Sequence, residues 1–142
     1  MIRKITYLKS LFSFLVVVFL TACSSSESTI SYIDQDTLLD RMSDDNAPLV
    51  IDVRPERFYN TAHVQGAINI PYSHLVKFLT DVPAEKDDDL VLYCEDGVFA
   101  DKAIDLLHKA GWKKLYHLEG NMQEWSKAGL PTSFPLADNA TS

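Results

Sequence analysis

The amino-acid sequence predicts one α/β domain with a mainly parallel central sheet of about five strands and helices on both faces. Three observations support this fold class. Short apolar segments alternate with segments whose apolar residues recur at helical spacing, as in βαβ units. Residues 49–53 and 90–94 are almost continuously apolar, as expected of parallel strands buried on both faces. The 142 residues, 46% of them hydrophobic, suit one globular core and are too few for two.

The first 22 residues differ from the rest of the chain. Arg3, Lys4 and Lys9 make a basic start, and an apolar run follows at residues 11–20. This run is shorter than the roughly 20 residues that a membrane-spanning helix needs. We therefore expect a signal peptide, and the alternative is an uncleaved N-terminal anchor.

The sequence Leu20-Thr21-Ala22-Cys23 resembles the lipobox of bacterial lipoproteins. The resemblance implies cleavage before Cys23 and attachment of lipid to this cysteine. Ser24 stands where an aspartate usually signals retention in the inner membrane, which favours the outer membrane in a Gram-negative cell. The protein is thus expected on the periplasmic side of a bacterial cell envelope, anchored by its lipid.

The chain accordingly divides into four expected parts. Residues 1–22 form the signal peptide, 23–29 the lipidated cysteine with a Ser-rich tether, 30–132 the domain, and 133–142 a C-terminal tail. The formal charge of the whole chain is −7, and loss of the signal peptide would remove three basic residues and no acidic ones. An acidic domain argues against nucleic-acid binding and against electrostatic adhesion to anionic lipid. Membrane attachment would then rest on the acyl chains.

The elements of the domain follow from its apolar pattern. Strands are expected at 30–33, 49–53, 67–71, 90–94 and 114–118. Helical segments are expected at 34–42, around 58–59, after 73, from about 100 to 110 and at 122–128. Ser73 is expected to cap the third of these helices, with Leu75, Val76 and Leu79 facing inward. Gly111 is expected to end the fourth.

Cys94 is the residue most suited to chemistry. It ends the clearest predicted strand and precedes a short loop with Gly97 and then a helix, and ligands of such folds bind at the carboxyl ends of strands. Backbone N–H groups and the helix dipole at this position would stabilise a thiolate or an anion. With Cys23 lipidated, Cys94 has no partner for an intramolecular disulfide. The alternative is an inert, buried cysteine.

Two further stretches of sequence carry a family resemblance that spans nearly all of 30–132. Asp-Val-Arg at 52–54, Phe-Tyr at 58–59 and His-Val-Gln-Gly-Ala-Ile-Asn-Ile-Pro at 63–71 are similar to the first signature of single-domain rhodaneses, which are sulfurtransferases. Leu-Glu-Gly-Asn-Met-Gln-Glu-Trp at 118–125 resembles the second.

The resemblance implies that Cys94 takes sulfane sulfur from a donor, becomes a persulfide and passes the sulfur to a thiol or protein acceptor. It implies no metal or organic cofactor. It also implies a six-residue loop whose backbone cradles the sulfur, formed here by Cys94, Glu95, Asp96, Gly97, Val98 and Phe99 before a helix that starts near Ala100. Related phosphatases use a longer loop, so the loop length favours sulfur over phosphate.

The loop departs from the family pattern in its charge. Phe99 stands where thiosulfate-using members commonly carry arginine, and the loop holds Glu95 and Asp96 and no basic residue. Two carboxylates near the sulfur would disfavour the thiolate and repel thiosulfate, so efficient thiosulfate chemistry is not expected. Asn121 and Ala62 stand at positions where glycine is common. Asparagine tolerates left-handed backbone, so we expect the fold to survive these changes.

Other candidate residues have simpler explanations. Asp52 and Arg54 could contact substrate, but a buried carboxylate paired with arginine at a strand end is more often structural. Asp87 to Asp89 read as a solvated loop rather than a metal site. Four histidines lack metal-ligand spacing and are expected to be packing or surface residues, namely His63, His74, His108 and His117. Both tryptophans, Trp112 and Trp125, are expected in or near the core.

Three functions remain open from the sequence. The first is a lipid-anchored rhodanese-like sulfurtransferase or sulfur carrier that uses Cys94. The second is a catalytically silent rhodanese-like module that recruits an envelope partner, which the acidic loop and Phe99 favour. The third is a thiol-stress sensor, which would require a sulfenate or a mixed disulfide on Cys94.

Overall fold

The computed structural model describes residues 30–45, 47–77 and 79–134. Its centre is a five-stranded sheet with the strand order β1-β6-β5-β2-β4, in which every neighbouring pair is parallel. The strands are β1 (Ser31–Ile33), β6 (Lys114–Leu118), β5 (Asp89–Tyr93), β2 (Leu49–Asp52) and β4 (Ile68–Asn69). The predicted α/β class and all five predicted strands are confirmed.

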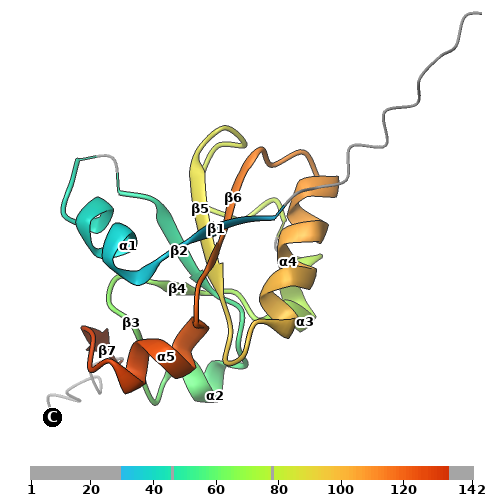
Figure 1. Ribbon diagram of the computed structural model, residues 1–142. Helices are drawn as coiled ribbons and strands as arrows, with labels where there is room; N and C mark the ends of the chain where they lie inside the picture. The colour runs from blue at the N-terminus through green and yellow to red at the C-terminus, as the bar shows by residue number, and fades with distance from the viewer. Residues whose placement is uncertain (1–29, 46, 78, 135–142) are drawn as a thin grey trace, which may run out of the picture.

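Helices cover both faces of the sheet (Figure 1). They are α1 (Gln35–Met42), α2 (Glu56–Tyr59), α3 (Tyr72–Leu75), α4 (Val98–Lys109) and α5 (Asn121–Lys127). Leu90, Leu92 and Cys94 share one apolar layer with residues of α3 and α4. Val91 and Tyr93 share the other with residues of α1 and α5. The central strand β5 is therefore buried on both faces, which explains its continuous apolar sequence.

Two predicted helix starts were wrong. Helix α4 begins at Val98, two residues before the predicted start, because left-handed Gly97 (φ 102°) turns the chain directly into the helix. The first apolar residue that faces the core is Ala100, and the exposed Val98 and Phe99 give no sequence signal of a helix. Helix α3 begins at Tyr72 after Pro71 and has no side-chain cap, so Ser73 does not cap it.

The structure corrects one further prediction and adds two strands that were not predicted. Val76 does not face inward, because α3 ends at Leu75 and the Val76 side chain is 66% exposed. The sequence also gave no sign of β3 (His63–Val64) and β7 (Thr132–Ser133), which pair antiparallel. The indole N–H of Trp125 donates to the Pro131 carbonyl at 3.0 Å and fixes the approach to β7.

The predicted signal peptide and the lipidated tether lie outside the described residues, as does most of the predicted tail. Among the helices that the structure describes, none is long and apolar enough to cross a membrane.

Candidate functional site

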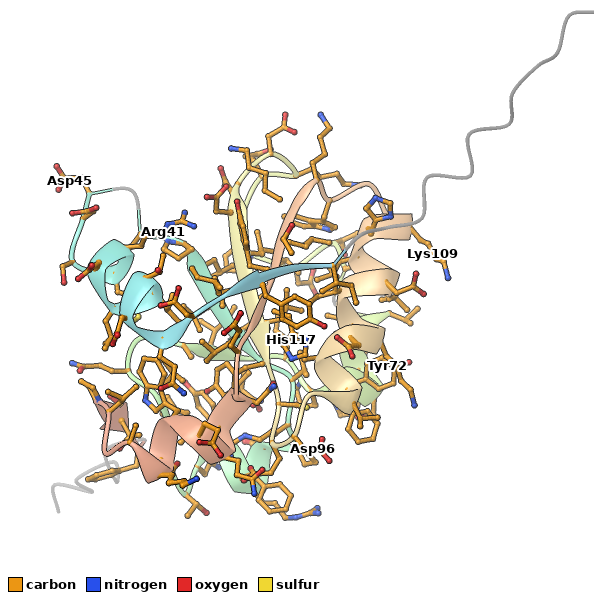
Figure 2. The ribbon with its side chains drawn as sticks, in the orientation of Figure 1. Arg41, Asp45, Tyr72, Asp96, Lys109 and His117 are labelled. Carbon is orange, nitrogen blue, oxygen red and sulfur yellow. The ribbon has the colours of Figure 1, made fainter. Side chains whose placement is uncertain are left out.

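Cys94 directly follows β5 at the carboxyl edge of the sheet, and its side chain is 1% exposed. The loop from Cys94 to Gly97 then leads into α4. Figure 2 shows Asp96 of this loop at the lower edge of the sheet, below His117. The sulfur is a free thiol. A buried thiol thus lies where a parallel α/β sheet ordinarily binds its ligands.

Two groups of the loop approach the sulfur. The Gly97 N–H donates to Cys94 Sγ at 3.1 Å. Asp96 Oδ1 lies 3.8 Å from Sγ and also accepts a hydrogen bond of 3.3 Å from the Val98 N–H. The Asp96 carboxylate therefore accepts one of the N–H groups at the start of α4, close to the sulfur.

A side chain at position 97 would be both strained and crowded. Its φ of 102° is left-handed, and a Cβ there would lie 3.1 Å from the His117 ring and 3.2 Å from Asn121 Nδ2. The loop therefore packs directly against these two buried side chains, and both its backbone conformation and this close approach favour glycine.

His117 and Asn121 form a buried polar chain beneath the loop. The Cys94 N–H donates to Asn121 Oδ1 at 2.9 Å, which leaves Asn121 Nδ2 to donate to His117 Nε2 at 2.9 Å. His117 Nδ1 lies 2.7 Å from Asp101 Oδ1 of α4. The His117 ring therefore connects Asp101 of α4 to Asn121. Asn121 keeps a left-handed backbone (φ 50°), as its sequence predicted, and also holds the backbone of Cys94.

Sequence reasoning missed this role of His117. The residue was expected to be an ordinary packing or surface histidine, and it is 4% exposed and hydrogen-bonded at both ring nitrogens. The available signal was its position four residues before Asn121, because His117 lies near the end of a strand and only Glu119 and Gly120 separate that strand from the next helix.

Asp52 and Arg54 form the buried pair that the sequence favoured. Asp52 is fully buried, and Arg54, 6% exposed, donates to both of its carboxylate oxygens. Arg54 also donates to the Ala62 carbonyl and, at 2.9 Å, to Glu95 Oε2. Burial alone would lower the pKa of Arg54, but the hydrogen bonds and charge of Asp52, with those of Glu95, raise this pKa above its ordinary value.

The Arg54–Glu95 contact changes the electrostatic description of the loop. The loop itself has no basic residue, yet Arg54 reaches it from the end of β2 and offsets the charge of Glu95. None of the ion pairs among the described residues includes Asp96. Asp96 is therefore the loop carboxylate whose charge acts on the sulfur.

A small apolar cavity lies on the other side of the loop. It has a volume of about 110 Å³ and is lined by Val53, Pro55, Pro71, Tyr72, Ser73 and Phe99. The Phe99 ring is half-exposed and contacts the Tyr72 ring with 5.4 Å between centroids. A larger hollow of about 500 Å³ lies on the side of Asp96 and His117. The Cys94 loop thus separates an apolar surface from an acidic one.

The remaining candidates lie away from this loop or serve packing. Trp112 and Trp125 are buried in the core, as predicted. Asp89 was expected in a solvated loop, and it instead begins β5 and pairs with Arg41. Asp87 does lie exposed and pairs with Lys113. In the part of the chain that the structure describes, no three His, Cys, Asp or Glu side chains are grouped to hold a metal ion.

The parallel sheet and the cysteine-bearing loop at its carboxyl edge define the class of this protein. Residues 34–128 match the model of the rhodanese-like domain. The chain belongs to the rhodanese-like domain family.

Proteins similar to this chain carry the domain in different contexts. The HTH-type transcriptional regulator Rv0324 of Mycobacterium tuberculosis is 37% identical over 84 residues, which are 58% of this chain and 36% of the regulator. The tRNA uridine(34) hydroxylase of Escherichia coli is 33% identical over 101 residues, which are 66% of this chain and 29% of the hydroxylase. The chain thus spans about a third of the length of these relatives.

Solved structures agree with this fold. The Alr3790 protein from Anabaena is 28% identical with a TM-score of 0.66, and the match covers 72% of this chain and 82% of that one. A thiosulfate sulfurtransferase from Pseudomonas aeruginosa is 26% identical with a TM-score of 0.61, and the match covers 74% of this chain and 20% of that one.

Proposed function

We propose that this domain transfers or carries sulfane sulfur as a persulfide on Cys94. The observation that carries the proposal is the setting of the thiol. Cys94 lies at the carboxyl edge of the sheet, its sulfur accepts the Gly97 N–H at 3.1 Å, and Asn121 fixes its backbone. A backbone N–H donor stabilises the negative charge that sulfur carries both as thiolate and as persulfide anion.

The chemistry needs no oxidant. The thiolate of Cys94 attacks the outer sulfur of a donor R–S–SH, the S–S bond of the donor breaks, and R–S⁻ leaves with the electron pair and takes up a proton. The sum is Cys94–SH plus R–S–SH giving Cys94–S–SH plus R–SH. An acceptor thiol then attacks the outer sulfur of the Cys94 persulfide and restores the thiol.

The loop favours a donor other than thiosulfate. Asp96 places a carboxylate oxygen 3.8 Å from the sulfur and accepts the Val98 N–H that an anionic donor would use. Phe99 adds an aromatic ring where a cation would help to bind an anion. Like charges repel, so an uncharged or protein-bound donor fits this loop better than a dianion.

Mass spectrometry of the purified protein tests the proposal. The protein is exposed in turn to an alkyl persulfide and to thiosulfate, and the Cys94 peptide is examined for the added mass of one sulfur atom. We expect this adduct with the alkyl persulfide, little of it with thiosulfate, and none in Cys94→Ser. Absence of the adduct with every donor would rule out the proposed function.

The location of the protein is part of the proposal. The lipobox at residues 20–23 supports lipidation of Cys23 and anchoring on the periplasmic side of a bacterial envelope, in the outer membrane of a Gram-negative cell. Growth with an alkyne analogue of palmitate should label the full chain and leave Cys23→Ala unlabelled. Equal labelling of the two proteins would refute the anchor.

A silent binding module is the second candidate. Asp96 beside the sulfur and the exposed side chains of Val98 and Phe99 favour it, because they suit contact with a partner better than anion chemistry. Under this function Cys94→Ser should complement a deletion strain fully. Loss of complementation with normal amounts of folded protein would exclude it.

A further inference from the structure

We propose that the apolar cavity lined by Val53, Tyr72 and Phe99 is a substrate subsite. It binds the short, uncharged carbon group R of an organic persulfide R–S–SH while the outer sulfur of that donor meets Cys94 Sγ. The inference rests on the proposed function only in taking Cys94 as the group that accepts sulfur. It adds where the carbon group R of the donor binds, which the sulfur-transfer step alone does not specify.

Cys94 does not itself line the cavity, but Val53, its neighbour across the sheet, does. Strands β2 and β5 pair in parallel up to Asp52 and Tyr93, and the Val53 N–H donates to the Tyr93 carbonyl at 3.0 Å. Val53 and Cys94 therefore follow the two strands side by side, with neighbouring strands about 4.8 Å apart. Their side chains belong to the same apolar layer, and Val53 forms part of the cavity wall.

The chemistry of the lining selects an uncharged group. None of the six lining residues is charged, and only Tyr72 and Ser73 carry a hydroxyl. On the opposite side of the loop, the Asp96 carboxylate opposes an anionic group near the sulfur. Lys102 lies over the Phe99 ring with its Nζ 5.4 Å from the centroid, and it does not line the cavity. An anionic group R would thus find no cationic partner in the cavity.

The size of the cavity limits the group to a few carbon atoms. Its volume of about 110 Å³ is smaller than the roughly 150 Å³ of a protein cavity that binds benzene. A propyl or butyl chain fits this space better than a large aromatic or peptide group. The Phe99 ring forms the movable wall, because its side chain is 48% exposed and can be shortened without opening the core.

Matched thiol reagents test the subsite without relying on sulfane transfer. Methyl and butyl methanethiosulfonate carry the same reactive sulfur and differ only in carbon length, and labelling is followed on the Cys94 peptide of the full chain. After division by the rates with free cysteine, we expect butyl to react about tenfold faster than methyl, which corresponds to about two buried methylene groups. The anionic sulfonatoethyl reagent should react more slowly than methyl.

Two variants locate the effect. Phe99→Ala removes one wall, and the preference for butyl should fall to about twofold or less. Val76→Ala is the control, because Val76 is also an exposed apolar residue (66%), lies outside the Cys94 loop and does not line the cavity. It should keep the full preference. Thermal unfolding of each variant confirms that the domain remains folded.

The outcomes separate this inference from the proposed function. Equal normalised rates for butyl and methyl in the wild type, or a preference that survives in Phe99→Ala, would overturn the subsite even if Cys94 forms a persulfide. A butyl preference that Phe99→Ala abolishes supports the subsite. If Phe99→Ala abolished the butyl preference but no donor gave a persulfide on Cys94, the subsite would be supported and the proposed sulfur transfer would be refuted.

Discussion

Replacement of Arg54 by methionine is expected to be among the most destabilising single changes in this domain. Methionine retains an apolar stem but removes the counterion of Asp52, which is fully buried. Breaking a buried ion pair by removing one partner costs about 3–5 kcal/mol, because the remaining charge is left without compensation. This is a large share of the roughly 5–15 kcal/mol by which domains are stable.

The contacts of Arg54 show where this cost arises. Its bond to Glu95 contributes little, because the Glu95 side chain is 60% exposed and an exposed pair contributes about 0–1 kcal/mol. Most of the loss comes from the three hydrogen bonds to Asp52, which are 2.7 to 3.1 Å long. Adding Asp52→Asn to the variant removes the uncompensated charge, and the double variant should be less destabilised than the sum of the single ones.

Urea unfolding, followed by the fluorescence of the buried Trp112 and Trp125, measures these differences. Arg57→Met is the matched control, because Arg57 is exposed and lies over the Phe58 ring at 4.6 Å. Its effect should stay within about 0.5 kcal/mol. The reasoning would be refuted if Arg54→Met cost no more than Arg57→Met, or if Arg54→Met and Asp52→Asn were additive.

Three further predictions concern the residues around the loop. Burial and the charge of Asp52 raise the pKa of Tyr93 in the folded domain, so this tyrosine ionises at lower pH in the unfolded chain. The free energy of unfolding should therefore fall as pH rises above about 10, and it should fall less steeply in Tyr93→Phe. An equally steep fall in both proteins, measured by urea unfolding between about pH 9 and 11, would contradict this. Asn121→Ala should be less stable than Asn121→Gly by about 1 kcal/mol. Both variants lose the hydrogen bond to the Cys94 N–H, but only alanine is strained at the φ of 50°. Equal stability of the two variants in urea unfolding would disprove this strain. Gly97→Ala should lower stability and the persulfide yield of Cys94 more than Gly129→Ala does. Gly129 has a left-handed φ as well, but a Cβ added there lies within 4 Å of no other atom. Equal effects of the two variants would show that crowding by His117 plays no part.

The sequence predicted the central sheet well because burial on both faces leaves a continuous apolar run. It could not predict β3 and β7, since two residues carry no periodicity and His63 pairs with a residue at the far end of the domain. The start of α4 was missed for a related reason. Val98 and Phe99 form the first turn of the helix but face solvent, so the apolar pattern begins only at Ala100.

At the site, the sequence placed Cys94 between strand and helix and favoured the pairing of Asp52 with Arg54. It did not reveal that Arg54 also reaches Glu95, because that contact joins residues 41 positions apart. The role of His117 depends likewise on Asp101, 16 positions away, and on its approach to Gly97. The local sequence pattern thus located the candidate reactive residue, Cys94. The charged and polar groups around its loop depend on contacts between residues far apart in the sequence.

The parallel order of the sheet also fixes the direction in which the molecule faces. Every strand of the sheet runs the same way as β1, so the chain enters the domain at the amino edge, while Cys94 lies at the carboxyl edge (Figure 1). The seven residues from Ser24 to Ile30 could span at most about 25 Å. With lipid on Cys23 holding this segment at the membrane, as proposed, the edge that carries Cys94 would face away from the membrane. The thiol would then meet molecules in solution rather than proteins embedded in the membrane.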